Sequence, residues 1–217
     1  MAVLAAAQSA SAASSGSATK PEKNAQSSNA THHFAIRLLA TEATRDAWIA
    51  RQIAYANDRY ADVGIAFHLQ AKERLEPAFR VLDGAQARDR VGRQAVRRGE
   101  ILWVVPERLV DLDGATRRRG VHWRDRADAR GEDQRRRWII VTADADPFVL
   151  AHELGHFFGL PHSKEAASFM NKTPGPHRPP PASRRLTARE RRRVLARTRA
   201  MLRNGRLEER PEAAASR

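Results

Sequence analysis

Three histidines and a glutamate lie close together in the sequence, at spacings that suit a single metal ion. His152 and His156 are four residues apart, so on a helix they share one face, about 6 Å from each other, and can bind the same ion. Gly159 can adopt the left-handed conformation that ends a helix, which allows the chain to turn back and bring His162 to that ion. Glu153 can reach a water bound to the ion. Three imidazoles and one water form an open tetrahedral site, which is typical of catalytic zinc.

The alternative is a surface helix with two unrelated histidines, because short patterns arise by chance. Gly159 and His162 add two further fixed positions, each with a geometric reason, and so favour the metal site.

A methionine follows the histidines and carries a resemblance to a known family. Met170 comes eight residues after His162, within the run Ser168–Asn171. The pattern His-Glu-x-x-His-x-x-Gly-x-x-His followed by a methionine turn resembles the metzincin metallopeptidases. Ser163, directly after the third histidine, is similar to the matrixin branch of that family. The resemblance implies that Met170 lies beneath the metal as an apolar floor and does not ligate it.

Peptide hydrolysis is the activity that the resemblance implies. Zinc held by the three histidines would lower the pKa of its water towards about 7. Glu153 would accept the proton of that water and deliver it to the leaving amine. A different class of zinc peptidase takes its third ligand from a later glutamate, for which Glu190 is the candidate, but His162 at the metzincin spacing is favoured.

Apolar patterns predict the elements that position these residues. The helix expected at 42–63 has an apolar stripe at steps of three and four, and two strands flank it, which indicates a parallel βαβ unit. Residues 72–99 are polar and give no assignment. Strands are expected at 34–39, 65–69, 101–105 and 138–142, and further helices after the Asp146-Pro147 start signal and after the capping box at 187–190.

By resemblance, the fold is expected to be α+β, an α/β-type sandwich of metzincin-like form. It would contain a twisted mixed sheet of about five strands with an antiparallel edge strand. A long first helix, a zinc-binding helix and a C-terminal helix would complete it.

Two further stretches are assigned to substrate binding by the same resemblance. Metzincins place an antiparallel edge strand before the zinc helix, and an exposed edge offers N–H and C=O groups to an extended peptide. We assign Gly120, Val121, His122 and Trp123 to that strand, although a loop is the competing interpretation.

The chain after the methionine would form the wall of a pocket for the substrate side chain, at Asn171, Lys172, Thr173 and Pro174. This stretch departs from the usual matrixin Met-Tyr-Pro turn. Lys172 also stands where metzincins of the astacin and serralysin kind place a tyrosine ligand.

Charge and composition add a second class of function. Lysine and arginine number 39 against 25 acids, for a net charge of +14, and residues 117–137 and 177–217 together account for all of it. These segments suggest a tether to an anionic surface, but few aromatics accompany them, which does not favour nucleic acid. There are no cysteines, which excludes disulfides, thiolate zinc ligands and a cysteine nucleophile.

Three hypotheses therefore remain open. The first is an active zinc endopeptidase with one catalytic Zn²⁺ and a peptide or protein substrate. The second is a basic polyanion-binding protein with a vestigial peptidase site. The third is a structural module stabilised by zinc.

The expected organisation is one catalytic domain between two tails. Residues 1–33 form a flexible leader, 34–205 the domain and 206–217 a frayed tail. The alanine-rich start resembles a degenerate export signal, so a secreted or periplasmic location is expected. No apolar run approaches the ~18 residues of a membrane span, and we expect a monomer.

Overall fold

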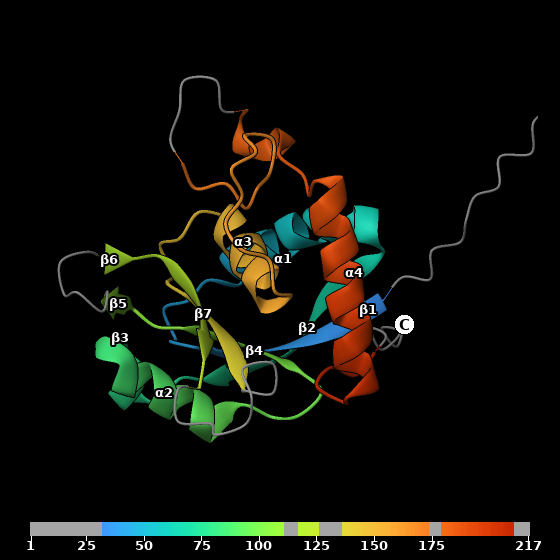
Figure 1. Cartoon of the computed structure of the whole chain (residues 1–217). Helices are drawn as coiled ribbons and strands as arrows, with labels where there is room; N and C mark the ends of the chain where they lie inside the picture. Colours follow the sequence, from blue (N-terminus) through green and yellow to red (C-terminus); the bar gives the residue numbers. More distant parts are fainter. Residues whose placement is uncertain (1–31, 111–116, 126–135, 174–178, 211–217) are drawn as a thin grey trace, which may run out of the picture.

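A five-stranded sheet forms the centre of the protein, in the order β2-β1-β4-β8-β7 (Figure 1). The computed structural model describes residues 32–110, 117–125, 136–173 and 179–210. β7 runs antiparallel to β8 at one edge, and the other neighbours are parallel. The expected mixed sheet with an antiparallel edge strand is therefore confirmed. Its strands are β1 His32–Ala40, β2 Ile65–Arg74, β4 Ile101–Val105, β7 Gly120–Arg124 and β8 Arg137–Val141.

Helices cover both faces of this sheet, and a small second sheet lies beside it. The helices are α1 Asp46–Tyr60, α2 Gly84–Ala95, α3 Phe148–Phe157 and α4 Ala188–Arg203. The second sheet has the order β3-β5-β6 and is formed by Val81–Leu82, Arg108–Val110 and Arg117–Arg118. Short 3₁₀ turns occur at Ala61–Val63, Pro77–Phe79 and Pro181–Ser183.

The two faces of the sheet contribute to two separate apolar cores. Trp103 and Ile139 point to the core shared with α1, α3 and α4. Leu102 and Ile140 point to the opposite core, which α2 covers. Figure 1 shows α2 on one side of the sheet and α1, α3 and α4 on the other. Because both faces are buried, the central strands are apolar without interruption, as the sequence indicated.

The predicted helix at 42–63 is shorter at both ends. It begins at Asp46 and ends at Tyr60, and a 3₁₀ turn then continues to Val63. Gly64 stops this turn in the left-handed conformation, with φ at +64°. The capping box predicted at the start of α4 is present, with Thr187 and Glu190 bonded reciprocally.

The structure describes the residues at both predicted domain boundaries. β1 begins at His32, so the last two residues of the expected leader belong to the sheet. Leu207 is only 1% exposed and bridges to Gly99, and Glu209 bridges to Phe34. Residues 206–210 are therefore held against the domain, because an apolar side chain and main-chain pairing anchor them. The leader at 1–31 and the tail at 211–217 lie outside the described residues. Within the described residues, no helix is long and apolar enough to cross a bilayer.

Candidate metal centre

Helix α3 presents two of the three histidines. It begins at Phe148, just after Pro147, and its first turn is closed by the Val149 N–H, which donates to the Asp146 carbonyl at 3.0 Å. Its other sides are buried in the core, which holds the helix in place. His152 and His156 point out on one face with ring centroids 4.8 Å apart. The spacing of four residues therefore places both imidazole rings on one face of the helix, as the sequence predicted.

The turn after α3 brings the third histidine back to the other two. Gly159 has φ at +83°, and the Leu160 N–H donates to the Gly155 carbonyl at 2.9 Å, which reverses the chain. The Nε2 atoms of His156 and His162 then lie 3.2 Å apart. One ligand atom from each of the three histidines lies within 4.8 Å of the others.

Main-chain carbonyls fix the orientation of two of the imidazole rings. His152 Nδ1 lies 3.1 Å from the Phe169 carbonyl, and His156 Nδ1 lies 2.7 Å from the Leu160 carbonyl. A carbonyl oxygen only accepts, so each Nδ1 carries the proton and each Nε2 keeps its lone pair. This is the arrangement in which histidines bind metal through Nε2. Tetrahedral zinc with Zn–N bonds of 2.0–2.1 Å needs nitrogens about 3.3 Å apart, which the His156–His162 pair already matches.

The surroundings favour the neutral form that a metal requires in two of the imidazoles, those of His156 and His162. Burial above all, together with the nearby His152, lowers the pKa of His156 to about 4, against the opposing hydrogen bond to the Leu160 carbonyl. Partial burial also lowers the pKa of His162, with contributions from the charges of Lys172 and Arg118. At neutral pH the free electron pairs are therefore available to a cation, without a proton to displace.

Glu153 is buried beside the histidines, with only 6% of its surface exposed. Its Oε2 accepts a hydrogen bond of 2.7 Å from the main-chain N–H of His122, on the edge strand β7. Burial raises the pKa of this carboxyl to about 7, although the His122 bond and the charge of Arg118 act in the opposite direction. A carboxyl with this pKa can both take and release a proton near neutral pH.

Met170 packs directly against α3, the helix that presents His152 and His156. It is fully buried, and a Cβ atom added to Gly155 would lie 2.3 Å from its Sδ atom. The Met170 carbonyl accepts a bond of 3.1 Å from the Ser163 N–H, which ties the methionine turn to the residue after His162.

Glu190, the alternative third ligand, is occupied elsewhere. Its carboxylate accepts the Thr187 N–H at 2.8 Å in the capping box, and it accepts the Ser168 hydroxyl at 2.9 Å. Ser168 Oγ in turn accepts the Met170 N–H at 3.0 Å. Glu190 therefore supports the methionine turn from α4, and among the described residues His162 alone joins the two histidines of α3.

Two cavities flank the histidines, and the residues predicted to bind substrate divide between them. A cavity of about 350 Å³ is lined by Gly120, Val121 and His122 of β7 together with Glu153, His156 and His162. Trp123, predicted to bind substrate, is not brought there. Its indole N–H donates to Asp89 of α2 at 2.7 Å, because alternate residues of a strand face opposite sides of the sheet.

The second cavity, of about 430 Å³, lies on the side of His152. Asn171 and Lys172, which the resemblance assigned to substrate binding, line it, and Gly120 and Glu153 line both cavities. Thr173 does not line it; its N–H donates to Asn171 Oδ1 at 2.7 Å. Pro174 lies outside the described residues. Tyr55 of α1 and Arg184 also line this cavity, and no sequence motif pointed to them because only the tertiary fold brings them near α3.

Comparison with solved structures identifies the fold. A metalloproteinase-II from Bacteroides fragilis is 17% identical, with a TM-score of 0.53 over 77% of this chain and 54% of that chain. An archaemetzincin from Methanopyrus kandleri is 18% identical, with a TM-score of 0.50 over 77% of this chain and 96% of that one. This chain shares the fold of these two proteins. It spans about half the length of the Bacteroides fragilis protein. No family model and no curated protein matches the sequence.

Proposed function

We propose that this protein is a zinc-dependent endopeptidase of the metzincin type. His152, His156 and His162 would hold one zinc ion, and Glu153 would act as general base and then as general acid. The convergence of three imidazoles beside a buried carboxyl carries the proposal. Structural zinc sites use four protein ligands, whereas three histidines leave a position for water or substrate.

Zinc bound at this triad would supply a Lewis acid that makes a water more acidic and polarises the carbonyl to be cleaved. Glu153 accepts the proton that the attacking water loses and passes it to the nitrogen of the leaving amine. Met170 packs against Gly155, one residue before His156, and so supports the helix that carries two of the ligands. The carbonyls of Phe169 and Leu160 keep the rings of His152 and His156 turned towards the ion.

Cleavage within a chain fits the shape of the site. The two cavities share Gly120 and Glu153, so the hollow continues on both sides of the catalytic carboxyl. Among the described residues, β7 has a neighbour in the sheet only on the side of β8, and its outer edge can pair with an extended peptide. A peptide in that position would extend beyond the cut in both directions, which supports an endopeptidase.

Zinc content and cleavage of an unfolded protein test the proposal together. We expect about one zinc per chain by elemental analysis, and cleavage of casein that a chelator stops. His162→Ala should lower zinc affinity by at least about a hundredfold and abolish cleavage, since loss of a ligand exceeds the 10–100-fold effect of losing a supporting residue.

His33→Gln serves as the control for this variant, because it removes an imidazole from β1, outside the triad. It should keep zinc and activity. Zinc without cleavage of any of several unfolded proteins would indicate the structural module instead, and binding unchanged in His162→Ala would contradict the ligand assignment.

A further inference from the structure

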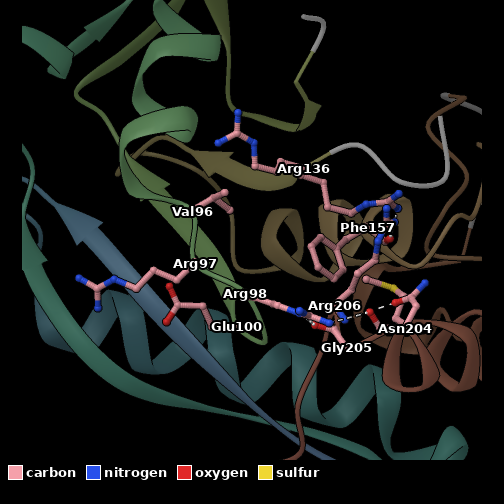
Figure 2. Close-up of a pocket in the computed structure, with 11 residues that line it drawn as sticks. Val96, Arg97, Arg98, Glu100, Arg136, Phe157, Asn204, Gly205 and Arg206 are labelled. Carbon is pink, nitrogen blue, oxygen red and sulfur yellow. Dashed lines mark hydrogen bonds between the residues drawn. The ribbon is translucent and has the colours of Figure 1, made fainter. Parts of the chain in front are cut away.

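A third cavity, which we call the arginine cavity, has a strongly positive lining and lies away from the histidine triad. It has a volume of about 370 Å³ and is found where the ends of α3 and α4 meet the starts of β4 and β8 (Figure 2). It shares no lining residue with the two cavities at the histidines. Five arginines and one glutamate line it, a formal charge of +4; they are Arg97, Arg98, Arg136, Arg137, Arg206 and Glu100.

The one lining acid does little to offset these charges. Glu100 forms an ion pair of 2.6 Å with Arg37, which does not line the cavity, and both side chains are almost completely buried. Two of the arginines have acidic partners away from the cavity: Arg136 pairs with Asp125 at 2.9 Å, and Arg97 lies 3.7 Å from Glu73. Figure 2 shows the guanidinium groups of Arg97 and Arg136 directed away from the middle of the site.

Main-chain oxygens hold two of the remaining arginines. Arg98 donates to the carbonyls of Gly205 and Asn204 at 2.9 and 3.3 Å, and Arg137 donates to the Phe157 carbonyl at 3.1 Å. These bonds fix the direction of each guanidinium, but a carbonyl oxygen carries no formal charge, so they leave the positive charge in place.

Helix capping explains part of this arrangement. The carbonyls that Arg98 and Arg137 bind belong to the ends of α4 and α3, where cations are favourable. Arg206 also lines this cavity, and its main-chain N–H donates to the Met201 carbonyl at 2.8 Å. The side chain of Arg206 adds a further charge to the same cavity.

We propose that this cavity is a binding site for a small, multiply charged anion of the phosphate class. The planar donors of arginine match phosphate oxygens two at a time. The volume lies near the lower end of the ~300–1,000 Å³ typical of small-molecule sites, which suits a diphosphate group better than a folded macromolecule. Both arginine-rich segments contribute, through Arg137 of one and Arg206 of the other.

Titration calorimetry with inorganic pyrophosphate at low salt tests the site. We expect one ion to bind per chain, with an affinity that falls as salt rises, since the attraction is screened. The double variant Arg98→Gln/Arg206→Gln should bind at least about tenfold more weakly, as about 1.4 kcal/mol of lost interaction requires. Arg192→Gln, an exposed position on α4 that does not line the cavity, removes one charge as a control and should bind like the wild type.

Two features keep the experiment decisive. Pyrophosphate also chelates zinc, but the double variant keeps all three histidines, so only the signal that it loses reports the cavity. If the double variant does not fold, Arg206→Gln alone should weaken binding and Arg98→Lys, which keeps the charge, should weaken it less.

A second experiment, which measures binding to lipid vesicles, distinguishes a soluble phosphate ligand from a lipid headgroup. Binding of pyrophosphate without binding to vesicles that contain a phosphoinositide indicates a soluble ligand, and binding of both indicates a lipid headgroup. Pyrophosphate binding that is equal in the wild type and the double variant, or binding of neither probe, would overturn the proposal.

Discussion

The histidine triad and the arginine cavity include successive residues of α3, but the charges of their side chains differ. His156 belongs to the triad, and Phe157 lines the cavity. In the triad, burial and neighbouring cations suppress the charge of groups that titrate near neutral pH. In the cavity, the charge belongs to guanidinium groups that no ordinary pH removes. The lesson is that a chain with net charge +14 can still offer imidazoles with lowered pKa values to a cation, where partial burial and nearby cations act on them.

The largest effect is expected from a change that separates catalysis from metal binding. Glu153→Gln should lower the rate of peptide hydrolysis by about 10²–10⁴-fold, the usual contribution of a general acid–base group. Zinc content should stay the same, because Glu153 is not a ligand. The rate is measured with a fluorogenic peptide, and zinc by elemental analysis.

The cavity variant provides the matched comparison for that experiment. Arg98→Gln/Arg206→Gln should retain peptide hydrolysis and zinc, since neither side chain lines the cavities at the triad. Near-normal hydrolysis in Glu153→Gln would contradict the role given to that carboxyl. A parallel loss in both variants would show that the two sites are not separate.

Dependence on pH is the next way to distinguish the two sites. In metal-free protein, the Glu153 carboxyl has a pKa of about 7, above its ordinary value of 4.5. The folded state therefore holds a proton that the unfolded state has lost, so stability falls as pH rises from 4.5 to 7. Glu153→Gln avoids this loss, and its advantage in free energy of unfolding should grow by up to about 3 kcal/mol across that range.

Denaturant unfolding at several pH values measures this difference. His156 acts in the opposite direction, because its lowered pKa makes stability fall as pH drops from 6.5 to about 4. Both proteins share that effect, so to first order it cancels in the comparison. A stability difference that stays constant from pH 4.5 to 8 would show that burial does not raise the pKa of Glu153.

The smallest effects are expected from substitutions at two glycines, one beside each site. Gly155→Ala would place a Cβ 2.3 Å from the buried Met170 Sδ, and crowding of this kind typically costs about 1–3 kcal/mol. Gly205→Ala adds a side chain at φ +64° and meets the Arg98 guanidinium at 2.5 Å, at a cost of about 1–2 kcal/mol for the backbone.

Thermal unfolding and ligand binding separate the two changes. Gly155→Ala should weaken zinc binding and leave pyrophosphate binding intact, whereas Gly205→Ala should do the reverse. Loss of both ligands in either variant would mean that the substitution disrupts the whole domain rather than one site.

The sequence was most informative where the determinants are local. The spacing of His152 and His156, the turn at Gly159 and the capping box at Thr187 each depend on a few neighbouring residues, and the structure contains all of these local features. The apolar runs predicted both central strands correctly, because strands buried on two faces need no alternation.

Helix α2 was not predicted, because its packing face is not apolar. The buried residues of that helix are Arg88, Val91 and Gly92. The Arg88 guanidinium lies 4.8 Å from the ring of Trp123, and Gly92 allows the ring of Trp138 to approach the helix backbone. A search for hydrophobic periodicity does not find such a face, since its partners come from distant strands.

The same reasoning accounts for the other differences. Trp123 faces α2 because of the register of β7 on β8, and the arginine cavity depends on four elements that meet only in the folded chain. The main-chain partners of residues 206–210 are likewise distant in sequence.

Hydrogen bonds from the Ser168 hydroxyl to Glu190 and from the Met170 N–H to Ser168 connect α4 to the methionine turn next to the histidines. If the first turn of α4 unfolds, the Ser168 hydroxyl loses its acceptor, and the serine that bonds the Met170 N–H is no longer held in place. The resistance of the histidine triad to heat should therefore depend on Glu190 in the first turn of the last helix, twenty residues beyond the methionine, as much as on the helix that carries His152 and His156.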